Sequence, residues 1–167
     1  AGLTCDIVGG AGTGTHELEA ASGVYNELQA GSYVFMDADY ARNKKPDGTP
    51  FDSFEHALFV WASVMSTPTS ERAVVDAGLK AFSTDCGPPV PWGMEGVIYE
   101  RPSDEHGILN LKNSNLRPRH GDKVALIPGH CDPTVNLHDW YVGIRGFSGL
   151  RPVVAAIWPV AARGAVF

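Results

Sequence analysis

Short apolar runs bounded by turn-forming residues constrain the fold of this chain more than any other feature of its sequence. Most of them are separated by Gly, Pro, Asn or Asp, and Val, Ile, Tyr and Trp recur within them. Such runs are typical of strands in a sandwich or barrel. The stretch at 54–65 has a second interpretation, a buried helix, because it is apolar on every side. The runs lie at residues 57–65, 73–75, 79–82, 97–99, 123–127, 140–144 and 153–158.

The first forty residues have a different pattern. Residues 4–8 predict a strand, a short helix is expected from about His16 after a glycine-rich loop, and residues 33–36 predict a second strand. Strands joined through a helix belong to parallel sheets, and one such unit can neither close a sheet nor cover both of its faces. This end of the chain therefore has the pattern of the last part of a larger βα structure.

A segment with turn chemistry throughout separates the two patterns. Residues 43–50 contain two prolines, a glycine, an asparagine and an aspartate, a composition that favours an exposed loop. We therefore predict an α+β chain in three parts. A βα end covers residues 1–42, a linker covers 43–53, and a mostly β domain, a barrel or a sandwich, covers 54–167.

Composition and charge exclude several functional classes. The chain has 167 residues, a 44% hydrophobic fraction and a formal net charge of −6, which argues against binding nucleic acid or an anionic membrane because both need a concentrated basic face. No apolar run reaches the roughly 18–20 residues of a membrane span. Cys5, Cys86 and Cys131 form neither an even disulfide set nor a C-x-x-C pair, so a reducing compartment, the cytoplasm, is expected.

The glycine-rich loop at 9–15 is the first candidate site. Its glycines would let backbone N–H groups approach a phosphate closely, and its threonines add hydroxyl donors. The spacing matches neither G-x-G-x-x-G nor the P-loop pattern, so a dinucleotide or nucleoside triphosphate is not indicated. A flexible turn explains the loop equally well. The residues that would contact the phosphate are Gly10, Gly12, Thr13, Gly14 and Thr15.

The second candidate is the segment His130-Cys131-Asp132, held between Pro128 and Pro133 directly after a predicted strand. Imidazole and carboxylate suit a divalent metal such as Mn²⁺ or Zn²⁺. In an extended segment His130 and Asp132 would point to the same side while Cys131 faces away. The structural alternative is a hydrogen-bonded histidine and an aspartate in a turn, and the three residues alone favour that alternative.

Other titratable residues carry weaker signals. Lys80 follows a turn and is predicted to be solvated rather than a Schiff-base lysine, and residues 104–107 form a charged turn. His56, His120 and His138 are isolated, and surface or satisfied core positions are expected for them. No catalytic triad can be recognised from spacing, because triads are defined by geometry.

Several segments together resemble one family, the metal-activated D-threonine aldolases, which are similar to eukaryotic-type D-serine dehydratases. The similar segments follow the family's order and extend over nearly the whole chain. This collinearity is far more specific than either motif alone, and it favours the metal interpretation of His130 and Asp132. The segments are GGAGTGT (9–15), ELQAGSYVFMDADY (27–40), ERAVVDAGLKAFSTDCGPP (71–89), SDEHG (103–107), GDKVALIPGHCDPTVNLHDWYVG (121–143) and WPVAARGA (158–165).

The resemblance implies an alanine-racemase-type fold, a βα barrel that binds pyridoxal phosphate followed by a mostly β domain, assembled as a homodimer. The glycine-rich loop would hold the cofactor phosphate, with Tyr33 and Met36 nearby. His130 and Asp132 would bind the metal. Because the dehydratases have His-x-Cys at this place, Asp132 favours an aldolase and a hard ion, Mn²⁺ or Mg²⁺, although Zn²⁺ remains open.

The implied reaction is cleavage of a D-3-hydroxy amino acid, such as D-threonine, to glycine and an aldehyde. One family feature has no counterpart here, since nothing resembles the segment that carries the Schiff-base lysine. The chain alone is therefore expected to be inactive and to need a companion segment with the rest of the barrel. The alternatives are a D-serine dehydratase-like lyase and a non-catalytic metal-binding fragment.

Overall fold

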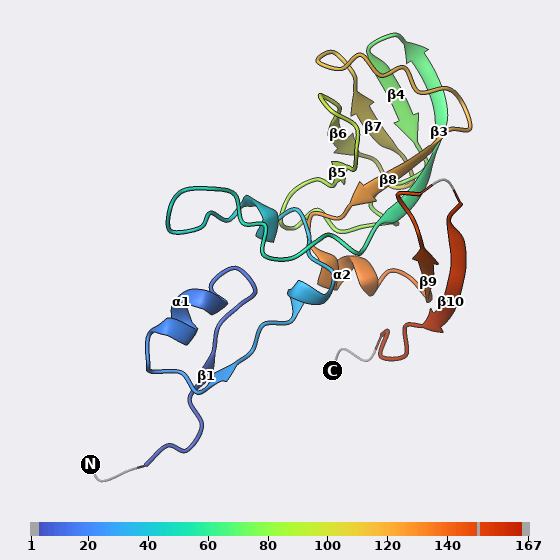
Figure 1. The fold of residues 1–167 in the computed structure, drawn as a ribbon. Helices are drawn as coiled ribbons and strands as arrows, with labels where there is room; N and C mark the ends of the chain where they lie inside the picture. The colour runs from blue at the N-terminus through green and yellow to red at the C-terminus, as the bar shows by residue number, and fades with distance from the viewer. Residues whose placement is uncertain (1–3, 150, 165–167) are drawn as a thin grey trace.

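A six-stranded antiparallel sheet forms the main body of the protein in a computed structural model, which describes residues 4–149 and 151–164 (Figure 1). The strand order is β5-β8-β3-β4-β7-β6. β5 and β6, the two ends of this order, lie close together in space, so the sheet curls almost into a barrel. The strands are β3 (Val60–Thr69), β4 (Arg72–Val75), β5 (Val90–Pro91), β6 (Ile98–Pro102), β7 (Gly107–Asn110) and β8 (Lys123–Ile127).

The core lies on the inner face of this curled sheet. Alternate residues of β3 and β4 point inward, as the pairs Ala62/Val64 and Ala73/Val75 show, and each of these four side chains is buried. Phe82 packs edge-on against Tyr99, with ring centroids 5.3 Å apart. The mostly β domain that the sequence predicts is therefore confirmed.

A buried hydrogen bond fixes one end of this core, because the Tyr99 hydroxyl donates to the Ala77 carbonyl over 2.7 Å. We expect Tyr99→Phe to lower the free energy of unfolding by about 1–2 kcal/mol, since the carbonyl is left buried without its partner. Urea denaturation measures the change. Tyr33→Phe is the matched control, because Tyr33 is 45% exposed; an equal loss in both variants would contradict the assigned bond.

Most predicted strands of the β domain are present, but two interpretations are wrong and two short strands were not predicted. Residues 54–65 contain no helix, and 60–65 belong to β3, so the helical interpretation of 54–65 is excluded. Residues 79–82 form a turn rather than a strand, because Leu79 and Lys80 bond back to the 103–104 backbone. The short strands β5 and β7 were not predicted, since Val90–Pro91 has only two residues and Gly107–Asn110 has only two apolar side chains.

The amino-terminal βα unit exists, but its strands are shifted from the predicted positions. Parallel pairing joins β1 (Gly9–Gly10) to β2 (Glu27–Leu28), with α1 (His16–Ala21) between them. The predicted strands at 4–8 and 33–36 are absent, and residues 32–34 form the 3₁₀ helix η1 (Ser32–Val34). Gly9 and Gly10 pair with β2, which places the sheet segment inside the glycine-rich stretch. This unit extends away from the six-stranded sheet (Figure 1).

Two further elements complete the chain beside the sheet. The short helix α2 (Cys131–Val135) follows β8, and an antiparallel hairpin of β9 (Trp140–Arg145) and β10 (Val153–Pro159) follows α2. Another 3₁₀ helix, η2 (Tyr40–Arg42), lies in the segment that leads toward the sheet. Within the described residues, no helix has both the length and the apolar character needed to cross a membrane.

Candidate metal centre

His130 lies at the end of the loop that joins β8 to α2, directly before the first helical residue. Its backbone is extended, with φ −140° and ψ 124°, and its carbonyl accepts a 2.7 Å hydrogen bond from the Thr134 hydroxyl. Gly129 has to be glycine, because a Cβ there would lie 2.1 Å from the Gly87 carbonyl oxygen. Gly87 itself has φ +108°, a conformation that favours glycine. The two loops therefore meet backbone to backbone.

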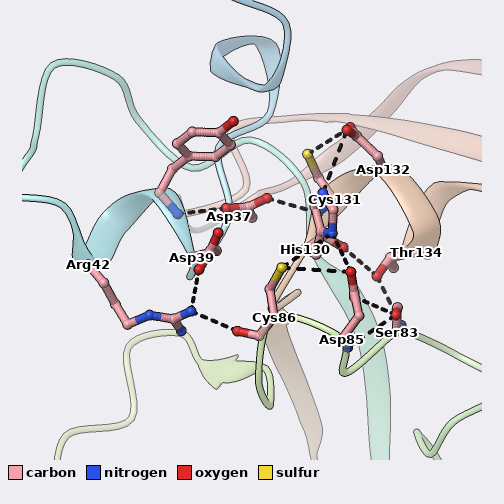
Figure 2. Close-up of polar contacts among 11 residues, drawn as sticks. Asp37, Asp39, Arg42, Ser83, Asp85, Cys86, His130, Cys131, Asp132 and Thr134 are labelled. Atoms are coloured by element: carbon pink, nitrogen blue, oxygen red, sulfur yellow. Dashed lines mark hydrogen bonds and ion pairs between the residues drawn. The ribbon is translucent and has the colours of Figure 1, made fainter. Parts of the chain in front are cut away.

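The imidazole of His130 lies between two carboxylates (Figure 2). Its Nδ1 is 2.7 Å from Asp85 Oδ2, a hydrogen-bond distance, and its Nε2 is 3.7 Å from Asp132 Oδ2. The His130 side chain is 27% exposed, whereas that of Asp132 is 72% exposed. One nitrogen is thus engaged within the protein, and the other faces a carboxylate at the surface.

The predicted backbone geometry of this pair is wrong, although the two side chains do lie near each other. Only His130 is extended, because Cys131 already begins α2. Cys131 does not face away from the pair. It is fully buried, and its thiol donates to Asp132 Oδ1 over 3.3 Å. Burial raises the pKa of Cys131 to about 12, which favours the thiol form in the absence of a metal.

The ionisation of the neighbouring groups is set by their hydrogen bonds. The Ser83 hydroxyl and then His130 hold the pKa of Asp85 at about 2, so this carboxylate is charged at neutral pH. Burial alone would lower the pKa of His130, but the hydrogen bond and charge of Asp85, with the charge of Asp132, outweigh it and raise that pKa. Burial, followed by nearby carboxylates, raises the pKa of the Cys86 thiol.

The His130–Asp132 separation fits a bound cation. Nitrogen and carboxylate ligands lie about 2.0–2.2 Å from an ion such as Zn²⁺, so two ligands of one ion are at most about 4.4 Å apart. The 3.7 Å between Nε2 and Oδ2 is within this limit. The exposure of Asp132 leaves its carboxylate open to water or substrate. These two residues can therefore hold a divalent metal while other coordination positions stay free.

The backbone of residues 128–131, called the His130 loop, is fixed by a buried carboxylate from the amino-terminal part of the chain. Asp37 is fully buried and accepts hydrogen bonds from the backbone N–H groups of Tyr40 and Cys131, both at 2.9 Å. Backbone bonds from Ala38 to Pro128 and from Asp39 to Gly129 continue the contact. Residues 37–39, which follow η1, thus hold the His130 loop in place (Figure 2).

Sequence reasoning assigned no role to Asp85, Cys86 or Asp37, although all three contact the His130 loop. Together, Asp85, Cys86 and His130 place potential ligand atoms within 4.8 Å of one another. The available signal was the Ser83-Thr84-Asp85-Cys86-Gly87 turn, since it lies in a segment with family resemblance and joins polar residues to a glycine. It lies some 45 residues from His130 along the chain, so only the fold brings them together.

Lys80, His120 and His138 have the surface or hydrogen-bonded positions predicted for them, but within the described residues His56 has neither. Lys80 Nζ forms an exposed ion pair with Glu105 Oε1 at 2.6 Å. His138 Nε2 is 2.7 Å from the Ala81 carbonyl oxygen, and His120 is exposed. His56 is half-buried, and its Nδ1 has no hydrogen-bond partner within the described residues.

The glycine-rich loop has a buried hydroxyl group that could bind an anionic ligand. Thr13 is fully buried, yet its hydroxyl has no hydrogen-bond partner within residues 4–149 and 151–164. Ala11 has φ +77°, a strained conformation of a kind found at ligand sites. The helix end adds no positive charge, because Glu17 and Glu19 lie in the first turn of α1, which has only six residues. The glycines and Thr13, rather than the end of α1, are therefore the groups that suit an anionic ligand.

The other residues predicted to bind the cofactor differ in their contacts and in their exposure. Within the loop, the Thr15 hydroxyl accepts from the Gly12 N–H and donates to Glu19, and a Cβ on Gly14 would clash with Asn43. Tyr33 is half-exposed and packs on Phe54, which also contacts His16 of α1. Met36 is only 1% exposed, so its side chain belongs to the interior.

The fold is shared with an alanine racemase-like protein. A solved structure of such a protein from Idiomarina loihiensis matches with a TM-score of 0.63 at 21% identity, over 85% of this chain and 41% of that one. The fold, a mostly β domain beside βα elements, is therefore alanine racemase-like. This likeness concerns the fold alone.

More similar proteins define the family. Residues 57–144 match the model of the putative serine dehydratase domain, and the chain belongs to that family. It is 50% identical over 165 residues to a 3-hydroxy-D-aspartate aldolase of Paracoccus denitrificans, covering 98% of this chain and 41% of the relative. The structure of a D-threonine aldolase from Filomicrobium marinum matches with a TM-score of 0.86 at 54% identity, over 99% of this chain and 43% of that one. The chain thus spans about two fifths of these relatives.

Proposed function

We propose that the protein is a pyridoxal-phosphate- and divalent-metal-dependent lyase that cleaves D-3-hydroxy amino acids to glycine and an aldehyde. The observation that carries this proposal is the His130–Asp132 pair, with Nε2 and Oδ2 3.7 Å apart at an accessible surface. The identity of about 50% to a 3-hydroxy-D-aspartate aldolase supports an aldol cleavage. A nitrogen and a carboxylate form a harder donor set than a nitrogen and a thiolate, which supports Mn²⁺ or Mg²⁺ over Zn²⁺.

Two groups of residues would bind the metal and the cofactor. His130 Nε2 and Asp132 would hold the metal, and Gly10, Gly12, Thr13, Gly14 and Thr15 would hold the phosphate of the cofactor, with Tyr33 beside them. When bound, the metal would lower the pKa of the substrate hydroxyl, and the pyridoxal ring would accept the electron pair of the broken Cα–Cβ bond. The proline and glycine residues around His130 keep its side chain positioned, which reduces the entropy lost on binding.

The proposed organisation follows the sequence boundaries. Residues 1–42 would complete a βα barrel, 43–53 would link it to the second domain, and 54–167 would present the metal residues. A further segment would supply the rest of the barrel and the Schiff-base lysine, and the whole enzyme would act as a homodimer. Cys5, Cys86 and Cys131 are all free, which supports a cytoplasmic location.

Product analysis tests the reaction in the full-length protein. We expect D-threonine to give equal amounts of glycine and acetaldehyde, and the rate should fall to background after chelation and return with Mn²⁺. Formation of 2-oxobutanoate and ammonia from D-threonine, or of pyruvate and ammonia from D-serine, would instead identify a dehydratase. Rates unaffected by chelation would contradict the role of the metal.

A further inference from the structure

The two carboxylates beside His130 differ in how they meet the imidazole. Asp85 Oδ2 is 2.7 Å from Nδ1, whereas Asp132 Oδ2 is 3.7 Å from Nε2. The shorter distance is that of a hydrogen bond and the longer one is not. A neutral imidazole has one N–H donor and one acceptor nitrogen. If Nδ1 donates to Asp85, then Nε2 is left with its lone pair on the side of Asp132.

Asp85 is itself held in place by a ring of hydrogen bonds (Figure 2). The Ser83 hydroxyl donates to Asp85 Oδ1 over 2.6 Å, and the Ser83 N–H donates to the Thr134 hydroxyl oxygen over 3.2 Å. The Thr134 hydroxyl in turn donates to the His130 carbonyl over 2.7 Å. The ring joins the loop of Asp85 to α2, the helix that carries Asp132, so hydrogen bonds connect the carboxylate of Asp85 to the segment 130–134.

We propose that Asp85 is a positioning residue that accepts the Nδ1 proton of His130 and thereby presents Nε2, together with Asp132, to the metal. The inference rests on the proposed function of His130 and Asp132 as metal ligands. Histidines that bind metals generally donate their other ring N–H to a carboxylate, carbonyl or water, which fixes the ring and makes it a better ligand. Asp85 is the described carboxylate at hydrogen-bond distance from Nδ1.

A different arrangement, in which Asp85, Cys86 and His130 Nδ1 are the ligands, fits the distances less well. Two ligands at right angles, each about 2.1 Å from one ion, are about 3.0 Å apart, and wider angles separate them further. The 2.7 Å between Asp85 and Nδ1 is shorter than this. Cys86 Sγ lies 3.6 Å from the same nitrogen, so the arrangement is disfavoured by the Asp85 distance rather than by the cysteine. A direct hydrogen bond between Asp85 and His130 explains the geometry better.

The test measures Mn²⁺ affinity in the full-length protein by competition with a chromophoric chelator. We expect Asp85→Ala to weaken Mn²⁺ binding about 10–100-fold, the usual effect of losing such a partner. Asp85→Asn should lose less, because its amide oxygen can still accept from Nδ1. Ser83→Ala should weaken binding only several-fold, since it removes the group that orients Asp85. Asp104→Ala is the control for lost charge and should bind as the parent does.

A second measurement reports on the ring directly. ¹⁵N NMR of the metal-free protein, at a pH above the pKa of His130, should show Nδ1–H for the parent and Asp104→Ala. In Asp85→Ala the ring should shift toward Nε2–H, the tautomer that predominates in free histidine. A purely structural role for Asp85 would leave the tautomer unchanged, and unfolding midpoints show whether the variants are folded.

The outcomes separate the two proposals. If Asp85→Ala binds Mn²⁺ like the parent while His130→Ala does not, the positioning role is overturned and the metal site stands. If His130→Ala also retains Mn²⁺, the metal site itself is overturned. If Asp85→Ala, Asp85→Asn and Cys86→Ala each lose as much affinity as His130→Ala while Asp132→Ala binds normally, the three are ligands and the positioning role is again overturned.

Discussion

Replacing His130 with alanine is expected to abolish Mn²⁺ binding at micromolar metal and to lower the rate of D-threonine cleavage by at least about 100-fold. The metal is proposed to stabilise the transition state by several kcal/mol, and each 1.4 kcal/mol corresponds to a factor of ten in rate. Asp132→Ala should have a similar effect, because two protein ligands leave no redundancy. Metal titration and initial rates in the full-length protein measure both consequences.

Two comparison variants sharpen this prediction. His120→Ala removes an exposed histidine outside the site and should change neither metal affinity nor rate. Asp132→Cys replaces the carboxylate with a softer thiolate, so the preference should shift from Mn²⁺ toward Zn²⁺. Normal Mn²⁺ affinity in both His130→Ala and Asp132→Ala would show that the ion binds elsewhere.

The second large effect is expected from Asp37→Ala, which should lower the free energy of unfolding by roughly 2–6 kcal/mol. The substitution leaves the buried N–H of Cys131 and the part-buried N–H of Tyr40 without their acceptor, and each unsatisfied group costs about 1–3 kcal/mol. Mn²⁺ affinity should fall as well, since the backbone of the His130 loop loses its hydrogen bond to Asp37. Chemical denaturation of the metal-free protein and metal titration measure the two effects.

Asp39→Ala provides the matched control for Asp37. It lies two residues away and forms an exposed ion pair with Arg42, so its loss should cost less than about 1 kcal/mol. Equal destabilisation by the two substitutions would mean that the hydrogen bonds of Asp37 do not hold the loop.

The sequence predicts the β domain well because most of its strands coincide with short apolar runs bounded by turn-forming residues. In β4, for example, the apolar residues Ala73 to Val75 supply the two buried side chains Ala73 and Val75, and turn residues bound this short apolar run in the sequence. The positions of β1 and β2 could not be predicted, because backbone pairing rather than apolar side chains places Gly9 and Gly10 in a strand. Propensity disfavours glycine in strands, and tertiary pairing overrides it here.

Some residues of the candidate site could likewise be predicted from the sequence, and others could not. His130 and Asp132 are two residues apart and could be proposed from sequence, whereas Asp85 and Asp37 reach them only through the fold. Even the local geometry was missed, since the extended backbone stops at His130 and α2 begins at Cys131. Pro133 is compatible with this early helix start, because proline is tolerated in the first turn.

The close approach of Gly87 and Gly129 limits how the site can be redesigned. Gly87 is needed for its positive φ, and Gly129 is needed because a Cβ there would clash with the Gly87 carbonyl. Neither loop can therefore be exchanged without the other. A combinatorial library aimed at new metal preference should therefore keep both backbones and vary side chains only, at Ser83, Asp85, Cys86 and Asp132. Within those four positions the accessible chemistry is broad, but the spacing between the two loops is not adjustable.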